Sequence, residues 1–196
     1  GVGHLVICDY DRMEVSNLQR QILHTTDHIG ETKASSALHR LKAQNPNIQI
    51  TALDYLLDDE MLYKEVELAD VVLDCSDNFP TRFAINRACV KAKKLLVSGA
   101  AIRFDAQITV FDPRQSLSSC YECIYKDIGG EGDTCSRLGI FAPLTGIIGS
   151  MQAAETLKLL LNIGETLCGK LLIIDALTME LRMLKVPKDP ACPTCS

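Results

Sequence analysis

The sequence predicts an α/β fold built on a Rossmann-like, doubly wound sheet, parallel in its first half and antiparallel in its second. Through residues 1–98, short apolar runs alternate with amphipathic segments, as in a parallel sheet with crossover helices. The runs Leu95–Ser98 and Gln107–Phe111 lie too close in sequence for a helical crossover, so they should pair antiparallel. Two more apolar runs close the chain after a long apolar helix.

The first half should alternate strand and helix. Its strands are predicted where β-branched and other apolar residues cluster: Gly1–Asp11, Ile48–Leu53, Val71–Cys75 and Leu95–Ser98. Its helices are predicted at Gly30–Asn45, Asp58–Val66 and Phe79–Lys93. Asn45-Pro46-Asn47 ends the first of them, because proline disfavours helical geometry in the residue before it.

The second half should contain a strand at Gln107–Phe111 and then a polar, Cys- and Gly-rich stretch, Ser116–Arg137, without long elements. A long helix is predicted at Leu144–Asn162, with the strands Lys170–Asp175 and Glu180–Val186 after it. One stripe of this helix is expected to carry its apolar side chains: Ile148, Met151, Ala154, Leu157 and Leu161.

The first predicted strand begins almost at the first residue, with Gly1 and Gly3 where a preceding helix would end. A nucleotide-binding fold usually opens with a strand, a Gly-rich turn and a helix N-terminus that takes the phosphates. We therefore expect the first strand and the Gly-rich loop to be missing from this chain.

Composition narrows the functional classes. At 196 residues with 47% hydrophobic residues, the chain is long enough for one domain with a sizeable core. A net charge of −5 argues against a nucleic-acid partner, and the lack of a run of eighteen apolar residues argues against a membrane span. Nine cysteines without an export signal favour a reducing compartment, so we expect a cytoplasmic protein.

Acids and cations surround the end of the first predicted strand. Asp9 and Asp11 follow the strand, and an acid there suits a ribose hydroxyl, although two solvated acids would give the same pattern. Polar donors and positive charge suited to phosphate oxygens follow in the segment Ser16-Asn17-Leu18-Gln19-Arg20 and at Lys33. Together they predict a site that holds a nucleotide by its sugar and its phosphates.

A second polar cluster, Asp74-Cys75-Ser76-Asp77-Asn78, lies between an apolar strand and a helix. Either Asp77 or Asn78 could be no more than the helix N-cap, and Asp74 could be buried in the strand end. A carboxylate at this edge can also hold Mg2+ on nucleotide phosphates. The residues alone leave both interpretations open.

Two CxxC pairs carry the most specific chemical signal. The two pairs are Cys120 with Cys123 and Cys192 with Cys195. Their spacing would let four thiolates complete the tetrahedral shell that structural Zn2+ prefers. Disulfides are the alternative, disfavoured by the missing export signal. A closed shell of four ligands has no open position, so the metal would be structural and would staple the C-terminal end to the body of the domain.

The remaining candidates are single residues. Cys135 lies in a Gly-rich stretch near Arg137, which could lower its pKa, and the alternative is an inert loop cysteine. The four histidines show no ligand spacing with the zinc cysteines, and we assign them no role.

Several motifs occur in an order that resembles one family: VSNLQRQILH from Val15, GETK from Gly30, DCSDN from Asp74, SGAAIRFDAQITVF from Ser98 and the two CxxC pairs. This set is similar to the ThiF/MoeB/HesA group, prokaryotic relatives of ubiquitin-activating enzymes. The resemblance covers residues 1–196 as a single adenylation domain, and the tract from Ser98 leans toward the molybdopterin-synthase branch over the thiamine branch.

The resemblance implies an enzyme that adenylates the C-terminal glycine carboxylate of a small ubiquitin-like sulfur-carrier protein, with Mg2+ and ATP. It implies that Asp9 holds the ribose, with Asp11 beside it. It also implies that Ser16, Asn17 and Arg20 line the phosphates, that Lys33 meets them from the helix, and that Asp77 positions Mg2+, with Asn78 adjacent. Cys120, Cys123, Cys192 and Cys195 match the family's zinc ligands. Cys135 matches a loop cysteine that joins the carrier in some members.

The resemblance also implies a homodimer, in which an N-terminal arginine is donated across the interface. That arginine and the family's phosphate loop would precede Gly1. Two alternatives remain: an NAD-dependent oxidoreductase that uses Asp9 for ribose, and a non-catalytic, zinc-stapled module that binds a ubiquitin-like partner.

Overall fold

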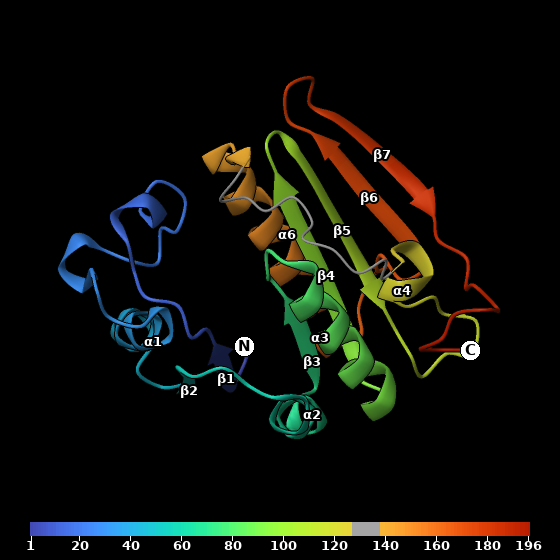
Figure 1. Ribbon diagram of the computed structural model, residues 1–196, viewed down its shortest axis with the longest axis horizontal. Coiled ribbons are helices and arrows are strands. Elements are labelled where there is room, and N and C mark those ends of the chain that lie inside the picture. Colours follow the sequence, from blue (N-terminus) through green and yellow to red (C-terminus); the bar gives the residue numbers. More distant parts are fainter. Residues whose placement is uncertain (127–137) are drawn as a thin grey trace. The chain divides into compact units, whose positions relative to one another are not determined.

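The computed structural model describes residues 1–126 and 138–196 and divides into two compact units, Gly1–Asp58 and Asp59–Ser196 (Figure 1). The first unit contains a two-stranded parallel sheet, in which β1 (His4–Cys8) pairs with β2 (Gln49–Leu53). Two 3-10 turns, η1 (Val15–Asn17) and η2 (Thr26–His28), and the helix α1 (Lys33–Gln44) connect these strands. The Thr32 hydroxyl caps α1 by accepting a hydrogen bond from the Ser35 amide at 3.3 Å.

The second unit is organised around a five-stranded sheet in the order β3-β4-β5-β6-β7. The strands are β3 (Val71–Asp74), β4 (Leu95–Ile102), β5 (Asp105–Phe111), β6 (Lys170–Asp175) and β7 (Glu180–Lys185). β3 and β4 are parallel, and each later pairing is antiparallel. The predicted change from parallel to antiparallel pairing is therefore confirmed, although β1 and β2 form a sheet of their own among the described residues.

The described part of this unit contains the helices α2 (Asp59–Leu68), α3 (Phe79–Ala92), α4 (Tyr121–Ile124) and α6 (Ala142–Leu161). Side chains alternate along β4, so Leu96 packs with α2, α3 and α4, while its neighbour Val97 packs with α6. Their cross-strand partners Phe111 and Val110 follow the same division. The sheet is thus covered on both faces, with α3 and α6 on opposite sides (Figure 1).

The predicted apolar stripe of the long helix is confirmed at Ile148 and Met151, which pack in the core, and is wrong from Ala154 onward. Leu157 and Leu161 are exposed, whereas the buried side of α6 consists of Leu144, Ile148, Gln152, Glu155 and Thr156. Polar side chains are tolerated there because each has a partner: the Leu167 amide donates to Glu155, and the Thr156 hydroxyl donates to the Gln152 carbonyl. A hydrophobicity pattern cannot anticipate such pairing.

Most predicted elements are confirmed with shifts of a few residues at their ends. β4 runs to Ile102 instead of ending at Ser98, because the turn at Arg103, with φ of 51°, lets β5 pair along its whole length. The stretch expected to lack long elements contains only the single-turn helix α4 in its described part. In the part of the chain that the structure describes, no helix is both long and apolar enough to cross a membrane.

Candidate functional site

The end of β1 brings two predicted acids against a predicted cation. The Lys33 ammonium lies 2.7 Å from Asp11 Oδ2 and 4.0 Å from Asp9 Oδ2. The backbone makes this possible, because the Lys33 amide donates to the Asp11 carbonyl and the Met13 amide to the Glu31 carbonyl. The structure thus brings Asp9, Asp11 and Lys33 together. Lys33 is mostly buried, with 13% of its side chain exposed.

The Asp9 carboxylate is held in an environment that disfavours its charge. Desolvation by burial raises its pKa, and this outweighs the hydrogen bond from the Asp11 amide and the attraction of Lys33, which both lower it. A carboxylate whose pKa is raised is destabilised in its ionised form at neutral pH. Hydrogen-bond donors on a ligand, such as ribose hydroxyls, would compensate for the lost solvation.

The other predicted phosphate contacts share one turn. Asn17 Oδ1 accepts from the Glu14 amide at 3.0 Å, and the Ser16 hydroxyl donates to the Glu14 carboxylate at 3.3 Å. The Arg20 guanidinium donates to the Ser16 carbonyl at 3.2 Å. These interactions fix the backbone of η1 and leave Arg20 half-buried.

His24 adds a group to this neighbourhood that sequence reasoning did not single out. Its Nδ1 lies 2.8 Å from the Ser36 hydroxyl of α1. Burial lowers its pKa, and the nearby Lys33 charge adds to this effect. His24 therefore stays neutral near Lys33 and does not add positive charge.

A buried network anchors the end of β3. Asp74 is 1% exposed, and its carboxylate accepts hydrogen bonds from the Ser76 amide and hydroxyl, Arg82 Nη1 and the Ser98 hydroxyl at 2.6–3.2 Å. Arg82, itself 7% exposed, also donates to the Gly99 and Ser76 carbonyls. A buried carboxylate with this many donors and a paired guanidinium is fully satisfied.

This network supports the loop that carries Asp77. Asn78 caps α3 by accepting from the Thr81 amide at 2.9 Å, so its interpretation as a helix cap is confirmed. Asp77 is exposed and is not the cap. Its carboxylate is therefore available at the sheet edge while its neighbours are held in place.

Gln152 of α6 completes the support from the other face of the sheet. Its Nε2 donates to the Asp74 carbonyl at 2.9 Å and to the Val97 carbonyl at 3.3 Å. A Cβ on Gly99 would lie only 2.4 Å from the Gln152 side chain, so a larger residue there would displace the Gln152 amide from these hydrogen bonds. Sequence reasoning missed Arg82, Ser98 and Gln152. Only the buried position of Asp74 signalled that such partners were required.

The four predicted zinc ligands are brought together. Sγ–Sγ distances are 3.6 Å for Cys120–Cys192, 4.0 Å for Cys120–Cys123 and 3.5 Å for Cys123–Cys195. Zn–S bonds of about 2.3 Å in a tetrahedron place the sulfurs about 3.8 Å apart. The observed distances fit that geometry and are far longer than a disulfide bond of about 2.05 Å.

The protein surroundings of this cysteine cluster also suit thiolate ligands. The Cys120 and Asp189 amides donate to Cys123 Sγ, and Asn86 Nδ2 donates to Cys120 Sγ, at 3.4–3.6 Å. Cys192 is fully buried. Burial raises the pKa of Cys120 to about 11, so a cation is the partner that would stabilise its thiolate.

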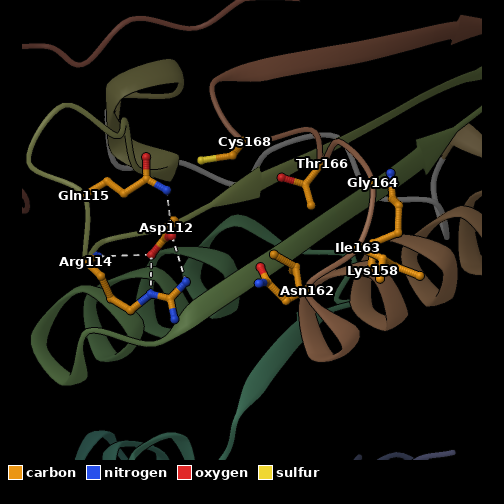
Figure 2. A pocket seen from close by; sticks show the side chains of 10 residues that line it. Asp112, Arg114, Gln115, Lys158, Asn162, Ile163, Gly164, Thr166 and Cys168 are labelled. Atoms are coloured by element: carbon orange, nitrogen blue, oxygen red, sulfur yellow. Dashed lines mark hydrogen bonds and ion pairs between the residues drawn. The ribbon is translucent and has the colours of Figure 1, made fainter.

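A separate cavity of about 230 Å³ lies between the end of β5 and the C-terminal end of α6 (Figure 2). Its most polar feature is the Arg114 guanidinium, which binds Asp112 through two hydrogen bonds of 2.7 and 2.8 Å. These hydrogen bonds hold the pKa of Asp112 below its usual value. None of the predicted site residues that the structure describes lines this cavity, which is smaller than a typical ligand pocket.

The predicted nucleotide residues fall in two groups. The first compact unit contains the candidates for the ribose and phosphates: Asp9, Asp11, Ser16, Asn17, Arg20 and Lys33. The second unit contains Asp77, Asn78 and, separately, the four cysteines predicted to bind zinc. In the first unit, Lys33 contacts Asp9 and Asp11, while Ser16, Asn17 and Arg20 make contacts within the turn that follows Glu14. In the second unit, the four cysteines form one cluster. Cys135 lies outside the described residues.

Comparisons with known proteins identify the family. The model of the ThiF family matches residues 1–194. The chain is 44% identical over 195 residues to the molybdopterin-synthase adenylyltransferase of Escherichia coli, covering 100% of this chain and 78% of that protein. It is 41% identical to the sulfur carrier protein ThiS adenylyltransferase of the same organism, covering 77% of it. The sulfur carrier protein adenylyltransferase of Thermus thermophilus is 42% identical, with 74% covered.

Solved structures share the fold. Escherichia coli MccB with ATP superposes with a TM-score of 0.84 at 24% identity, covering 100% of this chain and 60% of that one. The chain thus spans about three fifths of MccB. From the match over nearly its whole length, together with the cysteine cluster and the acid–lysine site after β1, the chain belongs to the ThiF family.

Proposed function

We propose that this chain adenylates the C-terminal glycine carboxylate of a small ubiquitin-like sulfur-carrier protein, using ATP and releasing pyrophosphate, for molybdopterin or thiamine biosynthesis. One observation carries the proposal. Lys33 is paired with Asp9 and Asp11 at the end of β1, in a chain 44% identical to an adenylyltransferase. The family assignment disfavours the NAD-dependent alternative, because the matched relatives are adenylyltransferases.

The residues of the first unit suit the nucleotide. The Asp9 and Asp11 carboxylates would accept hydrogen bonds from the ribose hydroxyls. The Lys33 ammonium, now paired with Asp11, would also bind a phosphate oxygen. The planar guanidinium of Arg20 would bind a second phosphate oxygen. Ser16 and Asn17 lie in the same turn as Arg20 and would supply shorter polar contacts.

Asp77 is assigned the Mg2+ site, with Asn78 beside it. Mg2+ is commonly bound through one or two carboxylates together with substrate phosphates, and when bound it supplies positive charge that offsets charge on the phosphates. Asp77 is exposed and follows a strand end held by Asp74 and Arg82. Its backbone is therefore preorganised while its carboxylate remains open to a ligand.

The chemistry requires two anions to meet. The carrier's terminal carboxylate attacks the α-phosphorus of ATP, an acyl-adenylate forms, and the bond to pyrophosphate breaks. Positive charge at Lys33 and Arg20 lowers the barrier to the extent that it stabilises the growing charge on pyrophosphate more than the ground state.

Replacing Lys33 by methionine tests the nucleotide site. We expect kcat/KM for ATP in carrier-dependent ATP–pyrophosphate exchange to fall by about 100-fold or more, because a preorganised cation is lost. Arg40→Met is the matched control, since Arg40 is an exposed cation of the same helix. Exchange that is equally fast in Lys33→Met and Arg40→Met would remove Lys33 from the site.

We also propose that Cys120, Cys123, Cys192 and Cys195 hold a structural Zn2+. The proposal is supported by their Sγ separations and by the amide donors around them. The metal would join the segment at 120–123 to the C-terminal residues 192–195, and the Lys126–Asp189 ion pair of 2.5 Å runs beside this link.

Replacing Cys192 by serine should lower the zinc content from about one ion per chain to near zero and reduce the free energy of unfolding by several kcal/mol. Metal analysis and thermal melting would measure the two effects. Cys8→Ser, at an exposed cysteine outside the cluster, should change neither. A protein that keeps its melting temperature in strong chelator would contradict the structural role.

The remaining assignments follow from the resemblance. We propose that the chain works as one adenylation domain in a cytoplasmic homodimer, and that Cys135 is the loop cysteine that joins the carrier. Mass spectrometry of the protein with its carrier and ATP would detect such a covalent adduct, and Cys135→Ser would abolish it.

A further inference from the structure

Three side chains with metal-binding atoms, none of them assigned to adenylation, come together in the first unit. Glu31 Oε2 lies 3.0 Å from His28 Nδ1 and 3.8 Å from His39 Nδ1. One ligand atom from each of the three residues lies within 4.8 Å of the other two. The two imidazole rings are 6.0 Å apart at their centroids, so both can face one point.

The backbone fixes the positions of these residues. His28 ends η2, and the Glu31 amide donates to its carbonyl at 3.1 Å. On the other side, the Met13 amide donates to the Glu31 carbonyl at 2.8 Å, and Arg12 donates to the Gly30 carbonyl at 2.7 Å. Gly30 makes the turn with φ of 90°, a conformation that favours glycine. His39 lies in the second turn of α1.

We propose that His28, Glu31 and His39 bind a late first-row divalent cation, Zn2+ foremost, through two imidazole nitrogens and one carboxylate oxygen. Two histidines and a glutamate are an established ligand set for zinc, and imidazole favours late first-row metals. Metal–ligand bonds of about 2.0–2.2 Å place tetrahedral donors about 3.4 Å apart. The observed separations of 3.0 and 3.8 Å lie on either side of that value.

Access and charge are consistent with metal binding. The side chains of His28, Glu31 and His39 are 26%, 40% and 62% exposed, so water can fill the remaining coordination. Glu31 supplies the negative charge that two neutral imidazoles lack. Without metal, the same atoms form the His28–Glu31 hydrogen bond, and the metal would replace it.

Binding would have a structural consequence. It would connect the turn at residues 28–31 to His39 in the second turn of α1. α1 is the helix that begins at Lys33. A cation that binds the folded state and not the unfolded one stabilises the fold in proportion to its concentration over its dissociation constant. The site is independent of the proposed adenylation, because none of its three ligands is assigned to ATP.

The test is a Zn2+ titration by calorimetry, on intact protein whose initial zinc content has been measured. We expect one equivalent beyond the zinc of the cysteine cluster, and a higher melting temperature when Zn2+ is added. Glu31→Gln and His39→Ala should each weaken this binding at least about tenfold, the loss that removal of even an outer-shell partner typically causes.

His4→Ala is the matched control, since His4 is an exposed histidine that contacts Thr51. It should leave the affinity unchanged. Co2+ provides a second measurement, because imidazole and carboxylate ligands lack the sulfur-to-metal charge-transfer absorption of thiolate-bound Co2+. Absence of the extra equivalent, unchanged binding in Glu31→Gln, or thiolate-type Co2+ spectra for that equivalent would overturn the proposal.

Discussion

Replacing Asp77 by alanine is expected to lower carrier-dependent ATP–pyrophosphate exchange by at least about 100-fold. The carboxylate is the ligand assigned to Mg2+, and without it the charge that develops on pyrophosphate loses its counterion. Asp77 is exposed and does not cap α3, so its removal should leave the melting temperature nearly unchanged.

The matched control is Asp70→Ala. Asp70 is an exposed acid just before β3, at the opposite end of the strand that leads to Asp77. It should keep full activity. Asp77→Asn should retain some exchange and require more Mg2+, because an amide oxygen is a weaker ligand than a carboxylate. If Asp77→Ala exchanges pyrophosphate at the parent rate, the catalytic assignment fails and the non-catalytic binding module becomes the better account.

Replacing Arg82 by methionine is expected to cost about 3–5 kcal/mol in the free energy of unfolding, because it leaves Asp74 buried with its carboxylate unpaired. Arg82 also donates to the carbonyls of Ser76 and Gly99, so these acceptors would lose a donor as well. Chemical denaturation of the two proteins would measure the difference.

Arg87→Met is the matched control, because Arg87 is an exposed arginine on the same helix. It should change stability by less than about 0.5 kcal/mol. A double variant, Asp74→Asn with Arg82→Met, should recover part of the loss, since the buried charge is then removed with its partner. A double variant as unstable as Arg82→Met would show that the unpaired carboxylate is not the cause.

Parts of the site were predictable because their signals are local. An acid directly after an apolar strand lies at the sheet edge wherever the strand is placed, which fixes the position of Asp9 after β1. Asp77 follows the end of β3 within three residues. The CxxC spacing places two thiols of each pair on one short turn, and the structure confirms that the four sulfurs meet. The order of strands and helices follows from hydrophobic periodicity over windows of ten to twenty residues.

Tertiary structure decided the rest. The partners of Asp74 come from α3, β4 and α6, and Gln152 is 78 residues away in sequence. Likewise, His28, Glu31 and His39 converge only because residues 11–13 pair with 30–33 and turn the chain into α1. By itself, the sequence determined the type of each element and the chemistry placed at its ends, because both depend on neighbouring residues. The contacts between side chains of different elements depended on how those elements pack together. Such packing cannot be deduced from the pattern of neighbouring residues.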